Sequence, residues 1–226
     1  MSRLPTPVAL LLAFALLLAA CGGEDEEKSA TPAATATPEA TAAAGCQKVH
    51  APKPNDTEVA KPTAELKAGT TYVARVVTNC GEFEITLDPK RAPRTGGSFK
   101  ALVDKRFYDG LGFHRIVAGF VIQGGDPKGD GSGGPGFNVT ERPPGDLVYS
   151  KGVVAMAKTA TDPAGTSGSQ FFVVTGEDAG LPPDYALLGK VTKGQDVVDR
   201  IGVAEVAPDE KPVDPVVISE LRVTES

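Results

Sequence analysis

The sequence predicts a mainly β domain, a barrel or sandwich of short strands with two helices. Three observations support this prediction. From about residue 70 onward, short runs alternate apolar and polar residues, which is the period of a half-buried strand. Turn-forming residues separate these runs, since the chain contains 26 glycines and 19 prolines. Two segments, 93–105 and 195–201, instead carry apolar residues at helical spacing. Many short strands with glycine-rich turns are typical of all-β folds.

The first pair of strands is expected at 72–77 and 82–87, joined by a turn at 79–81. In the second strand every other residue from Phe83 to Leu87 is apolar, so one of its faces is expected to be buried. The remaining strands are expected at 112–117, 119–124, 152–157, 170–175, 187–192 and 216–223.

The helix at 93–105 has a proline in its first turn, where a missing N–H is tolerated. Its apolar residues Phe99, Leu102 and Val103 lie at helical spacing. A second short helix is expected at 195–201. Two helices of this kind can cover the open ends of a barrel.

Composition excludes several classes of function. Lys and Arg number 23 against 29 Asp and Glu, which gives a net charge of -6 with no basic run, so nucleic-acid binding is not expected. Two histidines and three scattered cysteines do not form a metal site, and no cofactor is expected. Residues 129–134 match a dinucleotide-binding glycine pattern, but Pro135 follows and no helix pattern does, so these glycines are interpreted as loop formers.

The N-terminal sequence predicts a targeting signal. Arg3 precedes a continuous apolar run at 8–20, which fits a signal peptide and is short for a membrane span. Small residues before Cys21 resemble the bacterial lipobox, in which the cysteine receives lipid and becomes the new N-terminus. We therefore expect a signal peptide at 1–20 and a lipid anchor at Cys21. The alternative is an ordinary signal peptide cleaved nearby, with an incidental cysteine.

A tether and an arm separate this signal from the folded domain. Residues 21–45 contain no large apolar side chain, so they are expected to form a disordered leash. Residues 46–69 form an irregular arm, and 70–226 the folded domain. Outside the cytoplasm, Cys46 and Cys80 are expected to form a disulfide that staples the arm to the barrel; two free thiols are the alternative.

The strands expected at 112–117 and 119–124 bring together residues of unusual type. Arg115, Gln123 and several aromatic side chains can converge there with no nucleophile nearby. Rotation of an X–Pro amide needs no base, nucleophile or metal. It needs a donor for the proline nitrogen, which gains a lone pair as the amide twists, and an apolar slot for the ring.

Residues 113–126, FHRIVAGFVIQGGD, resemble the signature of the cyclophilins almost residue for residue. The resemblance covers about 70–226. It implies a closed, eight-stranded antiparallel barrel capped by two helices, with peptidyl-prolyl cis-trans isomerase activity. Further matched segments are GDPKGDGSGGPGF at 125–137, GVVAMA at 152–157, SGSQFFV at 167–173 and ALLGKV at 186–191.

The resemblance also implies the roles of individual residues. Arg115 would be the catalytic guanidinium, and Gln123 would bind the substrate backbone and orient Arg115. Phe120, counted with them as catalytic, would form a wall of the proline slot. The side chains expected to bind substrate, in the proline slot or the neighbouring groove, are Phe113, Val121, Met156, Ala157, Lys158, Gln170, Phe172, Leu181 and Tyr185.

Some positions depart from the family pattern. Lys158 replaces an asparagine common in relatives, Tyr185 stands where many relatives carry histidine, and the loop at 159–168 is longer than usual. His114 is expected to face away from Arg115 and to be structural.

Two functions remain open from the sequence. The first is an isomerase that assists the folding of secreted or envelope proteins, with proline-containing polypeptides as substrates. It would be a monomer held at the membrane by the lipid on Cys21. The second is a chaperone or scaffold that binds prolyl segments without turnover.

Overall fold

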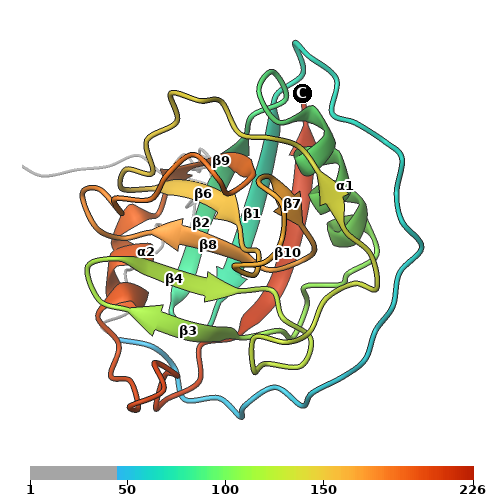
Figure 1. Ribbon diagram of the computed structural model, residues 1–226. Helices are drawn as coiled ribbons and strands as arrows, with labels where there is room; N and C mark the ends of the chain where they lie inside the picture. Colours follow the sequence, from blue (N-terminus) through green and yellow to red (C-terminus); the bar gives the residue numbers. More distant parts are fainter. Residues whose placement is uncertain (1–44) are drawn as a thin grey trace, which may run out of the picture. The chain divides into compact units, whose positions relative to one another are not determined.

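The computed structural model describes residues 45–226 of the chain. The expected signal peptide at 1–20, the lipidated Cys21 and nearly all of the expected tether lie outside the described residues. Within residues 45–226, no helix is both long enough and apolar enough to cross a membrane. This part of the chain contains ten strands and two helices (Figure 1).

Eight of these strands form one sheet, and β5 and β7 form a small ladder of their own. Neighbouring strands are antiparallel throughout. The eight strands of the main sheet and both helices lie within a few residues of the predicted positions. The elements are β1 (Tyr72–Thr78), β2 (Gly81–Leu87), α1 (Pro93–Asp104), β3 (Phe113–Val117), β4 (Val121–Gly124), β5 (Val139–Thr140), β6 (Val153–Met156), β7 (Thr166–Ser167), β8 (Phe171–Val174), β9 (Leu187–Lys193), α2 (Gln195–Gly202) and β10 (Ile218–Glu225).

The main sheet is open, so the expected closed barrel was wrong. Its strand order is β10-β1-β2-β9-β6-β8-β4-β3, and it curls through 223° as a half-barrel. An isolated bridge between Gly112 and Val217, rather than a ladder, joins the two edges. Pro215 lacks the N–H that a longer ladder would use, and a β-bulge between Phe113 and Arg115 bends β3. Both features limit pairing between β3 and β10.

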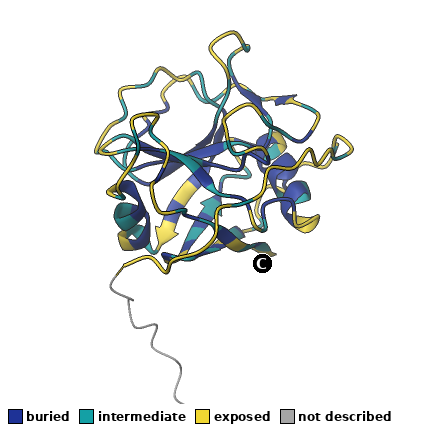
Figure 2. Cartoon of the chain, turned by 90° about the horizontal axis from the view of Figure 1, so that it is seen from below, coloured by how far each residue is buried: buried dark blue, intermediate teal, exposed yellow. Residues whose placement is uncertain are grey.

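The core fills the concave side of this sheet. On β2, Phe83, Ile85 and Leu87 are buried, as their alternation predicted. Figure 2 shows buried residues along the strands and on the sides of both helices that face the sheet. An aromatic cluster closes one part of the core, in which Phe171 contacts Phe99, Tyr108 and Phe113 at ring-centroid distances of 5.9–6.0 Å.

The two helices lie at opposite ends of the curled sheet, and both pack apolar side chains into the same core (Figures 1 and 2). α1 begins directly after Ala92 with the expected proline in its first turn, and it buries Phe99, Leu102 and Val103. α2 buries Val197, Val198, Ile201 and Gly202 against β2, β3 and β4.

The N-terminal arm, residues 46–69, runs around the outside of the sheet (blue to cyan in Figure 1). A disulfide joins Cys46 to Cys80 at the turn between β1 and β2. Further along, Val59 packs against the core. The arm residues whose backbone N–H groups donate to carbonyls of the rest of the domain, at 2.8–2.9 Å, are Gln47, Asn55, Val59 and Leu66. The arm is therefore held at several points along its length.

Candidate active site

A slot opens on the convex side of the sheet, beside β3, β4 and β8. Its cavity volume is about 180 Å³. The loop that precedes β9 closes one side. The residues that line the slot are Arg115, Phe120, Val121, Gln123, Ala157, Lys158, Phe172, Leu181 and Tyr185. The structure thus brings together nine of the twelve catalytic and substrate-binding residues chosen from the sequence.

The floor and walls of the slot are apolar because the sheet buries side chains on both of its faces here. One face of β4, β6 and β8 contributes to the core, and the other forms a second cluster that includes Val121, Ala155 and Phe172. Tyr185 stands against this cluster, with its ring edge-on to Phe172 at 5.5 Å between centroids. The result is a preformed apolar recess, a typical site for a small apolar group.

A chain of polar side chains forms the opposite edge of the slot. Arg115 and Gln123 are paired across β3 and β4, so the two side chains meet. Arg115 Nη1 donates to Gln123 Oε1 at 3.5 Å, and Gln123 Nε2 donates to Gln170 Oε1 at 3.0 Å. Gln170 Nε2 in turn donates to the carbonyls of Gly131 and Gly133, both at 2.9 Å. Gln170 lines the neighbouring groove rather than the slot, and its contact with Gln123 orients that side chain.

Arg115 has a second partner that the sequence did not reveal. Its Nε donates to Glu210 Oε2 at 2.6 Å. The Arg115 side chain is 35% exposed and that of Glu210 is 45% exposed, so water reaches this pair. Glu210 follows α2 in a proline-rich loop and is 95 residues from Arg115 in sequence, so no local pattern could have indicated the contact.

Two of the residues assigned to substrate binding lie elsewhere. Phe113 and Met156 are each 1% exposed and belong to the core on the concave side of the sheet. The β-bulge between Phe113 and Arg115 breaks the alternation that would have placed both side chains on one face. In β6, Met156 faces the core while Ala155 faces the slot cluster. Their assignment to the slot is therefore corrected to a structural role.

Lys158 forms the boundary between the slot and a larger groove of about 970 Å³ next to it. Its side chain is only 5% exposed, and its Nζ lies 3.2 Å from Asp184. The same Nζ donates to the carbonyls of Thr159 and Asp162 and lies 5.3 Å from the centroid of the Tyr185 ring. Lys158 therefore ties the long loop after β6 to the loop that carries Tyr185.

Tyr149 holds Tyr185 in place and was not singled out from the sequence. Its hydroxyl donates to the Tyr185 carbonyl at 2.6 Å and accepts from the Tyr185 N–H at 3.0 Å. Tyr149 is fully buried, and this burial raises the pKa of its hydroxyl to about 12. It therefore remains protonated and able to donate at neutral pH.

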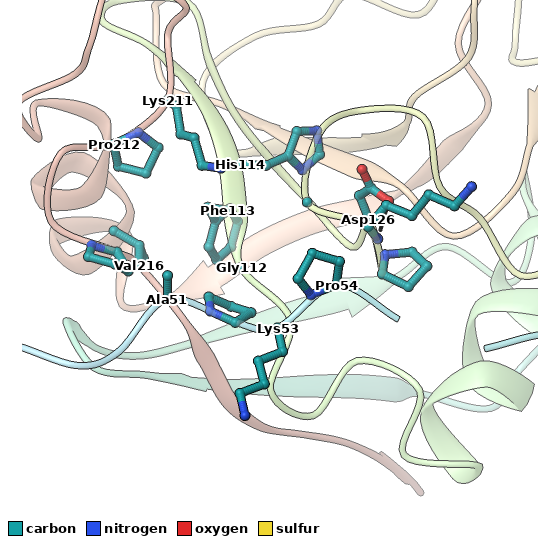
Figure 3. A pocket seen from close by; sticks show the side chains of 15 residues that line it. Ala51, Lys53, Pro54, Gly112, Phe113, His114, Asp126, Lys211, Pro212 and Val216 are labelled. Carbon is teal, nitrogen blue, oxygen red and sulfur yellow. Dashed lines mark hydrogen bonds between the residues drawn. The ribbon is translucent and has the colours of Figure 1, made fainter. Parts of the chain in front are cut away.

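His114 lies outside the slot and lines a separate cavity of about 90 Å³ between β3 and the arm. Figure 3 shows His114 beside this cavity with Pro54 of the arm and Asp126 of the glycine-rich loop, residues 125–137. Among the described residues neither imidazole nitrogen has a hydrogen-bond partner. Burial lowers the pKa of His114 below its usual value, so the ring is neutral at pH 7.

The arrangement can therefore bind an apolar ring and donate hydrogen bonds beside it. The residues that line the slot include no histidine, cysteine or carboxylate that would serve as a base or nucleophile. Among residues 45–226, no group of three or more histidine, cysteine or acidic residues is placed to hold a metal ion.

Comparison with known proteins agrees with this geometry. The family model "Cyclophilin type peptidyl-prolyl cis-trans isomerase/CLD" matches residues 73–223. A protein of Mycobacterium leprae named "Probable peptidyl-prolyl cis-trans isomerase A" is 34% identical over 169 residues, which cover 67% of this chain and 91% of the relative. "Peptidyl-prolyl cis-trans isomerase B" of Bacillus subtilis is 38% identical over 126 residues, which cover 55% of this chain and 86% of the relative.

A solved structure is also similar. It is a cyclophilin-type peptidyl-prolyl cis-trans isomerase of Cryptosporidium parvum, crystallised in the presence of the dipeptide Ala-Pro. The TM-score is 0.64 at 29% sequence identity, over 68% of this chain and 99% of the other. The fold, the slot and these relatives lead to one conclusion: the chain belongs to the cyclophilin-type peptidyl-prolyl cis-trans isomerases.

Proposed function

We propose that this isomerase rotates X–Pro amides by a hydrogen bond from Arg115 to the proline nitrogen, while the apolar slot holds the proline ring. The observation that carries the proposal is the position of the Arg115 guanidinium on the edge of a slot with the apolar walls Phe120, Phe172 and Leu181. A cationic donor and an apolar recess are the two features that amide rotation requires.

The physical reason lies in the change of the amide during rotation. The planar amide has a delocalised nitrogen lone pair, and the barrier to its rotation is about 18–20 kcal/mol. In the twisted amide the lone pair is localised on nitrogen and accepts a hydrogen bond. Arg115 therefore binds the transition state more tightly than the ground state, which is what accelerates a reaction. Turnover in milliseconds instead of tens of seconds requires a reduction of the barrier by roughly 6 kcal/mol.

The groove beside the slot is suited to the residues that precede proline. Gln123, Ala157 and Lys158 line both spaces, so a peptide can pass from one to the other without a break. The similar Cryptosporidium parvum isomerase was crystallised in the presence of Ala-Pro, which supports substrates of this kind. We propose extended, proline-containing polypeptides as substrates.

The place of action is proposed from the sequence. The signal peptide and the lipobox-like Cys21 indicate export and anchoring by lipid, and the pair Cys46 and Cys80 fits an oxidising compartment. The clients would then be secreted or envelope proteins during folding. We propose a monomer at the end of a leash on the outer side of the bacterial cell membrane.

Isomerisation of a short X–Pro peptide tests the catalytic role. Arg115→Ala is expected to lower kcat/KM about 100-fold, because removal of one donor to a transition state typically has this effect. The matched control is Arg75→Ala, which removes another half-exposed, ion-paired arginine, one that belongs to β1 and does not line the slot. Equal rates from wild type and Arg115→Ala, or no turnover from either, would leave the non-catalytic prolyl-binding function.

Metabolic labelling with a fatty acid tests the anchor. Wild type is expected to incorporate label and to fractionate with membranes, and Cys21→Ala is expected to do neither. Cys46→Ala is the control, because it removes a cysteine close in sequence. Label retained by Cys21→Ala would refute the proposed anchor.

A further inference from the structure

The loop that follows α2 places a carboxylate against the proposed catalytic arginine. We propose that Glu210 is a positioning residue, which fixes the orientation of the Arg115 guanidinium at the edge of the slot. The inference rests on the proposed role of Arg115 in amide rotation. It adds a residue that does not line the slot.

Glu210 holds β3 by two contacts at once. Its side chain accepts from Arg115 Nε at 2.6 Å, and its backbone carbonyl accepts from the Ile116 N–H at 2.8 Å. The carboxylate is therefore fixed relative to the strand that carries the arginine. A charged, well-aligned contact of this length is stronger than a neutral hydrogen bond.

The loop itself is braced from within. Glu210 N donates to the carbonyl of Ala207 at 2.9 Å, and Ala207 N donates to the carbonyl of Lys211 at 2.8 Å. An isolated bridge pairs Val206 with Pro212 at its base. The loop is thus a compact turn with its own hydrogen bonds, and it can present the carboxylate in one place.

The backbone of Glu210 provides a second, independent observation. Its φ is 65°, in the left-handed region, and Arg106 is the other non-glycine residue with positive φ in residues 45–226. Glycine would adopt this conformation without strain. A strained residue at the edge of an active site points to a functional requirement for its side chain.

The contact decides where the remaining donors of Arg115 can point. With Nε bound to Glu210 and Nη1 directed to Gln123, the planar guanidinium is fixed along two of its edges. Nη2 makes no hydrogen bond within the described part of the chain, so it remains available to a substrate. Of these two side-chain contacts, a variant without Glu210 would keep only the hydrogen bond from Arg115 to Gln123, at 3.5 Å.

Glu210 has two opposing effects on catalysis. It orients the guanidinium, which stabilises the transition state. It also offsets part of the positive charge of Arg115, which weakens the hydrogen bond to the proline nitrogen. Both side chains are about a third to a half exposed, so solvent screens the charge effect. Orientation is not screened, and we expect it to be the larger effect.

Isomerase kinetics of four variants test the inference. Glu210→Ala and Glu210→Gly are expected to lower kcat/KM about three- to tenfold, mainly through kcat, because the arginine acts in the transition state. Glu210→Gln keeps an acceptor for Nε and is expected to retain at least half of the activity, roughly. Asp209→Ala is the matched control. It removes a carboxylate from the same loop, but this carboxylate accepts from Lys211 N and not from Arg115.

Thermal unfolding separates positioning from a structural role. Glu210→Gly relieves the positive φ and is expected to unfold at the same temperature as wild type or higher, while its activity falls. The Arg115 Nε–H resonance in heteronuclear NMR is expected to exchange slowly with water in wild type and faster in Glu210→Ala.

Several outcomes would overturn the inference. Unchanged or higher kcat/KM in Glu210→Ala would show that the carboxylate does not position the arginine. If all three Glu210 variants lost activity only to the extent that their melting temperature fell, the result would indicate a structural role alone. Equal rates of wild type and Arg115→Ala would refute the proposed catalytic mechanism itself. That result is distinct from one in which Arg115→Ala is slow but the Glu210 variants are as fast as wild type.

Discussion

Removal of the disulfide between Cys46 and Cys80 gives a quantitative test of the arm. The two cysteines are 34 residues apart, so the bond closes a loop of that length in the unfolded chain. The loop-entropy relation then gives a contribution of about 4 kcal/mol at 25 °C to the free energy of unfolding. A domain of this size is typically stable by about 5–15 kcal/mol, so the loss would be a large fraction of the total.

The variant for this test is Cys46→Ala with Cys80→Ala. Alanine is preferred to serine because Cys80 is 2% exposed and packs in the core, where a hydroxyl would need a partner. Urea unfolding, followed by far-UV circular dichroism, is expected to give a free energy of unfolding lower by about 3–4 kcal/mol than that of oxidised wild type. The smaller side chain at Cys80 adds a further loss on the order of 1 kcal/mol to that of the crosslink.

The control is a reducing agent added to both proteins. It should lower the midpoint of wild type and leave the double variant unchanged. A difference below about 1 kcal/mol between oxidised wild type and the variant would refute the reasoning. It would mean that the arm unfolds separately from the sheet, so that the bond does not constrain the unfolding transition being measured.

Three further changes test the site and its support. Phe113→Ala is expected to lower the free energy of unfolding by about 3–5 kcal/mol, as for other core aromatics, while the KM of the folded protein stays unchanged. Tyr149→Phe leaves the backbone N–H and carbonyl of Tyr185 without a partner, so it is expected to lower stability by about 1–2 kcal/mol and to raise KM. Burial lowers the pKa of His114, so the unfolded state binds the proton more tightly. The neutral ring therefore stabilises the folded state fully above the pKa of the unfolded chain, about 6.5, and this stabilisation is lost as the pH falls below it. Between pH 7.5 and 5 the melting temperature should drop more in wild type than in His114→Phe.

Each of these predictions has a control or a result that would contradict it. A raised KM in a correctly folded Phe113→Ala variant would indicate that Phe113 does contact the substrate. Tyr108→Phe removes another buried hydroxyl, which donates to Ser169, and it should lower stability without a change in KM. If both tyrosine variants raise KM alike, the effect does not pass through Tyr185. Identical pH profiles for wild type and His114→Phe would contradict the burial argument.

The strands of the sheet were predictable because their signals are local. Alternation from Phe83 to Leu87 and glycine or proline between the runs mark the eight main strands with little help from distant residues. Strands β5 and β7 have two residues each, which is too short for any periodic pattern. The open edge between β3 and β10 depends on register and on the bulge at Phe113 and Arg115, which are non-local properties of the paired strands.

The location of the slot was predictable where matched motifs contain its residues, and less so where the direction of a side chain decides which face it occupies. Arg115, Gln123 and Phe172 lie in matched motifs and line or border the slot in the structure. Side-chain direction failed at Phe113, because one extra residue in a strand reverses the face of its neighbours. Glu210 and Tyr149 act through contacts between segments far apart in sequence, which no window of the chain contains.

The position of the disulfide also determines how the domain responds to a pulling force. A tension applied to the chain before residue 45 reaches Cys46 first and passes through the sulfur atoms to Cys80, at the turn between the paired strands β1 and β2. The arm beyond Cys46 then carries little of the load, so its contacts with the glycine-rich loop at Asn55 and Val59 are not peeled away. The carbonyls of that loop hold Gln170, and through it the polar edge of the slot. The crosslink thus mechanically isolates the catalytic side of the molecule from whatever pulls on its N-terminus.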